Sequence, residues 1–200
     1  IENSLAACDT VAQNVHLLNC PALRYIEIHY SEKECGNKID KIPITVSEMS
    51  KIQALGKKQL RRLAFVLLCV AKYWDCVSEN NNHWVNTADK EILKMANINT
   101  SIERQSALFS ELRQAGMIKF SKKIDNLNVQ VLFVDECKDH PVMEINDFRN
   151  LGYQFMKYCG EPYFACANCG IVTKKKDPTR GRSQKYCPDC AAEIRTQQNI

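Results

Sequence analysis

Apolar residues recur every three or four positions from Lys57 to about Val77, the longest helical pattern in the chain. This spacing places them on one side, so it predicts a long amphipathic helix with one buried face. A polar loop, Ser78–Asn86, follows. Thr87 is then predicted to cap a short helix at Ala88–Ala96, because a threonine oxygen can accept a hydrogen bond from a free N–H group of the first turn.

A third helix is predicted after the turn Asn97–Thr100. Thr100 or Ser101 is expected to cap it, and it runs to about Ala115, where Gly116 ends it.

Beyond that glycine the apolar period changes from helical to alternating. The change predicts strands at Met117–Ile124 and Val129–Asp135. The intervening Asp125–Asn128 is rich in residues that tolerate tight turns, so the two strands are expected to form a hairpin.

The flanking segments carry weaker patterns. Residues 23–30 and 42–46 alternate as short strands, and Ser47 is expected to cap a helix that ends near Leu55. After the hairpin, Asn146 or Asp147 is expected to cap a connector helix. Its stripe of large apolar residues is interpreted as core packing rather than a surface for stacking bases. The stripe consists of Phe148, Leu151, Phe155 and Tyr158.

The order of long helix, short helix, turn, third helix and β-hairpin resembles a winged helix-turn-helix domain. Residues 108–118, Leu-Phe-Ser-Glu-Leu-Arg-Gln-Ala-Gly-Met-Ile, are similar to the passage from a recognition helix into the first wing strand. The resemblance implies that the third helix enters the DNA major groove and that the wing contacts an adjacent groove or the backbone. Many domains of this family instead dock onto proteins. The nucleic-acid contacts expected on this basis are Arg104, Gln105 and Arg113 on the third helix and Lys122 and Lys123 before the wing turn.

Four cysteines near the C-terminus carry the clearest chemical pattern. Cys166 and Cys169 form one C-x2-C pair, and Cys187 and Cys190 form a second pair seventeen residues later. This spacing is typical of a site in which four thiolates surround one zinc ion. Four protein ligands leave no open position, so the zinc is expected to be structural. The segment resembles a treble clef or a zinc ribbon; two disulfides, four free thiols, or Cys159 as a substitute ligand are the alternatives.

Charge is distributed unevenly along the chain. The formal net charge is +4, and residues 163–200 account for all of it, with 7 Lys and Arg against 3 Asp and Glu. Between the two cysteine pairs, a basic loop held at both ends by metal is expected to contact phosphates; a merely solvated loop is the alternative. The basic residues of this loop are Lys174, Lys175, Lys176, Arg180, Arg182 and Lys185.

Several functional classes are disfavoured by the sequence. The longest apolar run, Leu63–Ala71, has nine residues and is too short to span a bilayer. The histidines are isolated and no glycine-rich phosphate loop occurs, so catalysis is not expected. The remaining cysteines are scattered, which together with the zinc pattern predicts a reducing, cytoplasmic environment.

The sequence therefore predicts an α+β protein in four parts. These are an N-terminal extension with short strands and a helix (1–56), a winged helix domain (57–135), a connector helix (136–162) and a four-cysteine zinc module (163–200). The expected function is binding of DNA, with RNA as the second candidate, in transcription control or replication of the bacterial or phage type. The alternatives are an adaptor or inhibitor that binds another protein, and a redox switch that releases zinc. The sequence does not predict the oligomeric state.

Overall fold

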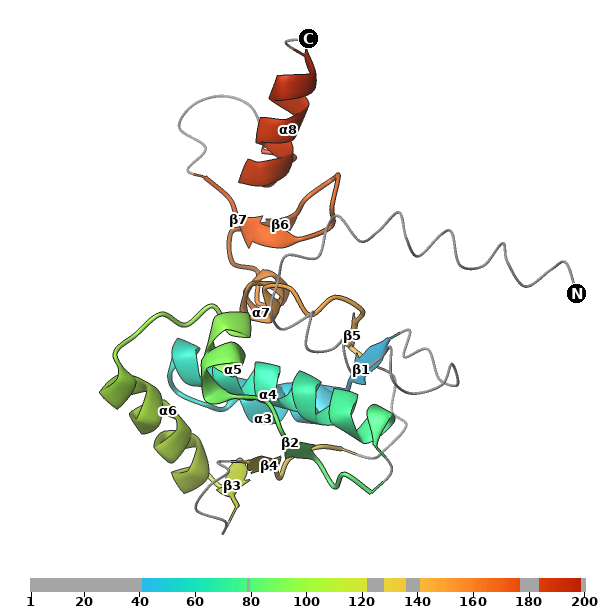
Figure 1. Ribbon diagram of the computed structural model, residues 1–200. Helices are drawn as coiled ribbons and strands as arrows, with labels where there is room; N and C mark the ends of the chain where they lie inside the picture. The colour runs from blue at the N-terminus through green and yellow to red at the C-terminus, as the bar shows by residue number, and fades with distance from the viewer. Residues whose placement is uncertain (1–40, 79, 122–127, 136–140, 177–183, 199–200) are drawn as a thin grey trace, which may run out of the picture. The chain divides into compact units, whose positions relative to one another are not determined.

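The helix α4 (Lys58–Val77) is the centre of the apolar core in the computed structural model, which describes residues 41–78, 80–121, 128–135, 141–176 and 184–198 (Figure 1). Every side chain from Leu63 to Ala71 is buried. The sequence predicts one buried face for this helix, but the structure buries its middle on all sides. The reason is that other elements pack around it, so the polar residues are confined to its two ends.

Four shorter helices contact α4. They are α3 (Val46–Gln53), α5 (Asp89–Met95), α6 (Ile102–Gln114) and α7 (Leu151–Tyr158). The predicted cap of α6 is confirmed at Ser101, whose side chain accepts a hydrogen bond from the Arg104 amide. The predicted cap of α5 at Thr87 is wrong. Ala88 occupies the N-cap position, and the Thr87 hydroxyl instead accepts from the indole Nε1 of Trp74 at 3.2 Å.

The strand β4 (Val129–Val131) is the middle of a three-stranded antiparallel sheet with the order β2-β4-β3. β3 (Ile118–Phe120) is its predicted hairpin partner, although shorter than expected. β2 (Trp84–Val85) falls in the segment predicted to be a polar loop. Two residues are too few to show an alternating pattern, so only pairing with β4 identifies them as a strand. Most of the predicted hairpin turn lies outside the described residues.

A second antiparallel pair joins β1 (Ile42–Ile44) to β5 (Met143–Ile145). β5 was not predicted, because the sequence around it was interpreted as part of the connector. The helix after β1 is capped by Thr45 rather than Ser47. The Glu48 amide donates to the Thr45 hydroxyl at 3.2 Å, and the Glu48 carboxylate accepts from the Thr45 amide at 2.8 Å, which is a reciprocal capping box.

The start of α7 also differs from the prediction. Asn150 is its N-cap, with φ 50°, so neither Asn146 nor Asp147 caps it. Asp147 instead accepts hydrogen bonds from Arg149. Gly152 in the first turn is essential for the packing of α7, because a Cβ atom there would lie 2.1 Å from the carbonyl oxygen of Ala96.

The aromatic stripe around α7 packs largely as predicted. Phe155 is buried against Phe65, with ring centroids 5.2 Å apart. Phe148 precedes the helix and meets Tyr73 edge-on at 5.4 Å. Tyr158, by contrast, is exposed. Phe155 therefore packs α7 against α4, Phe148 adds a contact to α4 just before the helix, and Leu151 is buried.

The C-terminal elements are a hairpin and a helix: β6 (Tyr163–Ala165), β7 (Val172–Lys174) and α8 (Pro188–Gln198). The chain as described mixes helices with small antiparallel sheets, which confirms the α+β class. The predicted strand 23–30 and the rest of residues 1–40 lie outside the described residues. Within the described ranges, no helix combines the length and apolar character needed to cross a bilayer.

Candidate metal centre

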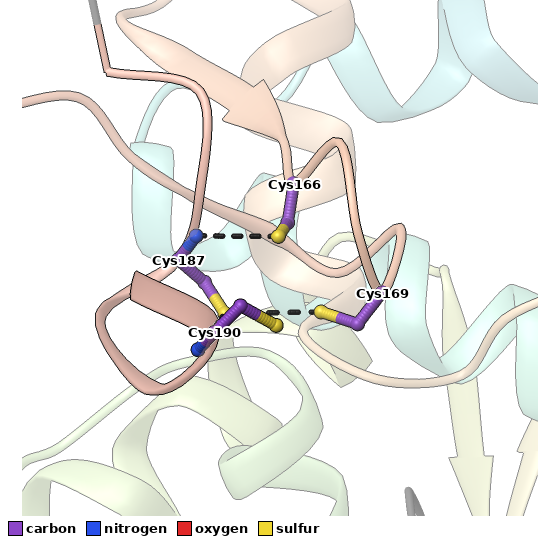
Figure 2. Close-up of side chains that lie close together, drawn as sticks. All are labelled: Cys166, Cys169, Cys187 and Cys190. Carbon is purple, nitrogen blue, oxygen red and sulfur yellow. Dashed lines mark hydrogen bonds between the residues drawn. The ribbon is translucent and has the colours of Figure 1, made fainter. Parts of the chain in front are cut away.

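The first cysteine pair lies at the tip of the β6–β7 hairpin (Figure 2). The Cys166 amide donates to the Ile171 carbonyl at 2.9 Å, and the Gly170 amide donates to the Cys166 carbonyl at 2.9 Å. Gly170 has φ 74°, a conformation that other residues adopt at a cost, so glycine suits this turn. The closed turn presents the side chains of Cys166 and Cys169 to the same point.

The second pair lies at the start of α8. Cys187 directly precedes the helix, Pro188 is its first residue, and Cys190 is in its first turn. Proline is well suited to this first position, because its missing N–H group would have no partner there. The Ala191 amide donates to the Cys187 carbonyl at 3.0 Å. Both sulfurs therefore lie where the helix dipole favours negative charge.

The four sulfur atoms converge on one point. All lie within 4.8 Å of one another, and the Sγ atoms of Cys169 and Cys187 are 3.7 Å apart. Tetrahedral coordination with Zn–S bonds of about 2.3 Å places sulfurs roughly 3.8 Å apart, so the cluster fits a metal ion with a modest contraction. None of the four clustered cysteines forms a disulfide bond. Cys159 is exposed at the end of α7 and is not a member of the cluster.

Crowding at the cluster changes the pKa values of Cys166, Cys169 and Cys187 in different directions. Burial would raise the pKa of Cys166, but hydrogen bonds from nearby backbone amides outweigh it and lower this pKa to about 6. Burial, followed by the adjacent thiols, raises the pKa of Cys169 to about 12. Burial also raises the pKa of Cys187. One thiolate therefore forms readily, whereas four together require a cation to neutralise their charge.

Hydrogen-bond donors surround the sulfurs. The Cys187 amide donates to Cys166 Sγ at 3.2 Å, and the Asn168 side chain donates to Cys190 Sγ at 3.4 Å. Arg149 donates from Nη2 to the Cys169 carbonyl at 2.8 Å. Such contacts orient ligands and stabilise thiolate charge. The sequence pattern gave no signal for Arg149, because it lies twenty residues before Cys169 and outside the C-x2-C spacing.

Two of the expected base-reading residues on α6 make contacts within the protein. Arg104 pairs with Glu111 at 3.2 Å, and Glu111 also pairs with Lys57 at 2.7 Å. The Gln105 side chain donates to the Thr100 carbonyl at 2.9 Å. Arg104 and Gln105 are partly buried, and one side-chain nitrogen of each already has a partner within the protein.

The third expected reader, Arg113, is exposed near the end of α6, with its guanidinium 5.7 Å from the centre of the Phe120 ring. This contact holds Arg113 beside β3. Lys122 and Lys123, expected to contact phosphates from the wing, lie outside the described residues.

The basic loop between the cysteine pairs is described in part. Lys174, Lys175, Lys176 and Lys185 are exposed, and the Lys185 carbonyl accepts from the Ala167 amide at 2.9 Å. That hydrogen bond joins the end of the basic loop to the first cysteine turn. Lys176 is held by its amide, which donates to the Gln184 side chain at 3.1 Å.

The other two cations predicted in this loop, Arg180 and Arg182, lie outside the described residues.

Comparisons with models of protein families, with curated proteins and with solved structures gave no match for this chain. The function must therefore be inferred from the site and the fold.

Proposed function

We propose that this protein binds nucleic acid, with residues 57–135 acting as a winged helix domain and the C-terminal segment as a zinc-stabilised basic module. The observation that carries the proposal is the element order α4-β2-α5-α6-β3-β4 with strand order β2-β4-β3. A helical triplet followed by a hairpin is the arrangement of a winged helix. The strand β2 pairs with β4 and so adds a third strand to the hairpin. This pairing strengthens the resemblance that the sequence pattern indicated.

Zinc is the metal that the donor set favours. Four cysteine thiolates in a tetrahedral arrangement suit zinc, and four protein ligands leave no place for a substrate or an activated water. Cys166, Cys169, Cys187 and Cys190 would hold the ion, which supplies positive charge and fixes the hairpin to α8. On this proposal the ion is structural, and the protein is not an enzyme.

The exposed lysines of the basic loop are the proposed phosphate contacts. Lys174, Lys175 and Lys176 are consecutive and exposed, and Lys185 follows shortly before the second cysteine pair. A loop with both ends fixed at one metal presents these cations with little further loss of conformational freedom on binding. Phosphate contacts give affinity without sequence preference, so any preference would come from α6 and the exposed Arg113.

Titration of metal-loaded protein against duplex and single-stranded DNA at two salt concentrations tests this proposal. Affinity should fall steeply with salt, and replacing Lys175 and Lys176 with Ala should lower the log–log salt slope by about 2 for duplex DNA. The double variant with Lys51 and Lys157 changed to Ala removes the same charge from exposed helical positions and should retain the slope. Absence of binding at low salt would contradict the proposal.

A protein-docking role is the second candidate, and α6 supplies the observation that favours it. Ile102 in its first turn is 76% exposed, and Arg104 is neutralised by Glu111. The outer face of α6 is therefore less basic than a groove-binding helix usually is. If the protein binds neither the DNA of that titration nor an RNA of matching sequence added as a third ligand, an adaptor or inhibitor becomes the better interpretation.

A further inference from the structure

We infer that metal binding at the four cysteines is energetically coupled to the turn between α5 and α6 through an asparagine bridge, formed by Asn97 and Asn150. The inference rests on the proposed metal centre and not on nucleic-acid binding. It makes the cysteine cluster a regulator of the helix-turn-helix segment, in addition to a support for its own module.

The first half of the bridge lies in the turn itself. Asn97 follows α5 with φ 54°, and the Ile98 amide donates to the Leu93 carbonyl at 2.9 Å, which closes the end of the helix. Arg62 of α4 donates to the Asn97 carbonyl at 3.2 Å. The backbone of Asn97 is thus held by α4 and α5, so its side chain is available to bind residues at the start of α7.

The second half of the bridge reaches the hairpin that carries two cysteines. The Tyr153 amide donates to Asn97 Oδ1 at 3.1 Å, Asn97 Nδ2 donates to Asn150 Oδ1 at 3.0 Å, and Asn150 Nδ2 donates to the Val172 carbonyl at 3.1 Å. A backbone amide can only donate and a carbonyl can only accept. These two ends therefore dictate the orientation of both side-chain amides, and the chain of bonds is fully matched.

Neighbouring contacts make the bridge stiff. Arg149 bonds the Cys169 carbonyl at 2.8 Å while Asp147 holds its guanidinium at 2.7 Å. Gly152 packs directly against the Ala96 carbonyl, so α7 cannot move away from the turn without losing close contact. Two successive residues, Arg149 and Asn150, thus bind one carbonyl in the first cysteine turn and one in the strand that follows it.

Coupling follows because the metal fixes these acceptors. With the ion bound, the carbonyls of Cys169 and Val172 stay in place and hold Arg149 and Asn150, which in turn hold Asn97. Without it, the tip of the hairpin is no longer joined to the second cysteine pair, and the carbonyl that Asn150 binds is held less firmly. Linkage is reciprocal, so an ordered turn must also favour metal binding by the same factor.

Hydrogen exchange on the full chain, metal-loaded and after chelation, tests the inference. The Ile98 and Tyr153 amides should exchange at least fivefold faster without metal, the lower end of a typical coupling of about 1–3 kcal/mol. The Val131 amide, which donates to the His83 carbonyl in the central sheet, serves as the internal reference and should be unaffected. Unchanged exchange at Ile98 and Tyr153, despite stoichiometric metal, would overturn the inference alone.

Variants of the bridge separate coupling from general stability. Asn150→Asp keeps an acceptor for Asn97 but removes the donor to Val172, and Asn150→Gly removes both while tolerating the positive φ. Both variants should still bind one metal ion and should lose the effect of metal on Ile98 exchange. Asn82→Asp, at an exposed residue with φ 51°, is the matched control and should keep it.

The possible failures differ in what they contradict. A wild-type response to metal that persists in both Asn150 variants would overturn the asparagine bridge as the route. Failure of the wild-type chain to bind metal would overturn the proposed metal centre together with this inference. Neither result depends on whether the protein binds DNA.

Discussion

Two regions of the chain, the described residues from 41 to 158 around α4 and the C-terminal segment 163–198, are stabilised in different ways. Around α4, nine consecutive side chains from Leu63 to Ala71 are buried. In the described part of the C-terminal segment, the buried residues are Val172 and three of the clustered cysteines, and α8 buries only Cys190. Apolar burial thus accounts for the fold around α4. The hairpin and α8 bury too little surface to be stable alone, so we expect them to depend on the proposed metal ion.

Metal removal should produce the largest difference between the two regions. Structural zinc contributes an apparent 10–16 kcal/mol, roughly, to small modules of this kind, and folding and binding are coupled. Chelation, or the change Cys187→Ser, should abolish the ordered NMR signals of α8 and the β6–β7 hairpin while those of α4 persist. Cys159→Ser, outside the cluster, is the control and should retain one metal ion by elemental analysis. Loss of the α4 signals on chelation would mean that the two regions are not separately stabilised.

A core substitution should produce the opposite pattern. Phe65 is fully buried and packs on Phe155, so Phe65→Ala should lower the free energy of unfolding of the α4 region by about 3–5 kcal/mol. Denaturant unfolding followed by tryptophan fluorescence measures this, since Trp74 and Trp84 both lie in that region. Metal content of the folded variant should remain one ion per chain. Metal loss that follows the lowered unfolding midpoint of α4 in this variant would mean that the two regions are not separately stabilised.

A buried ion pair in the α4 region should rank next. The Glu48 carboxylate is completely buried, and it accepts from Lys72 at 2.7 Å and from the Asp135 amide at 2.9 Å. Lys72→Met leaves that carboxylate without its cation, and the expected loss is about 3 kcal/mol, near the lower end for buried pairs because Lys72 is itself 12% exposed. Lys51→Met, on an exposed face of α3, is the control. Equal unfolding midpoints for the two variants would show that the pair is unimportant.

The smallest effect is expected at the start of α3. Thr45→Ala removes the hydroxyl of the capping box and should cost about 1 kcal/mol. Ser47→Ala, at the position that the sequence pattern favoured as the cap, should change stability by less than about 0.5 kcal/mol. Thermal unfolding of both variants gives the comparison. If Ser47→Ala were the more damaging, the cap assignment would be wrong.

The parts of the fold that the sequence predicts are those with a long period or a fixed spacing. The helical period of α4 extends over five turns, and the two C-x2-C pairs are separated by a length that suits one metal. Both signals are local, and the structure places their residues accordingly. The apolar period after Gly116 likewise predicts β3 and β4, because each alternates over enough positions to be detected.

The parts that the sequence does not predict depend on which partner a residue finds, and for the two missed strands that partner lies far away in the chain. β2 and β5 are strands only because β4 and β1 pair with them. Thr87 and Asp147 are good capping residues by type, but Trp74 and Arg149 use their oxygens instead. Arg104 and Gln105 have side chains suited to reading bases, but within the protein they bind Glu111 and the Thr100 carbonyl.

The contact at Gly152 also restricts which sequences can keep this packing. With the Ala96 carbonyl only 2.1 Å from where a Cβ would stand, even the smallest side chain has no room, and displacing α7 by one residue would bring Leu151 or Tyr153 to the same place. We therefore expect homologues that retain this helix pair to be invariant at Gly152, while exposed neighbours such as Lys157 vary freely. A relative with a larger residue here must have separated the two helices.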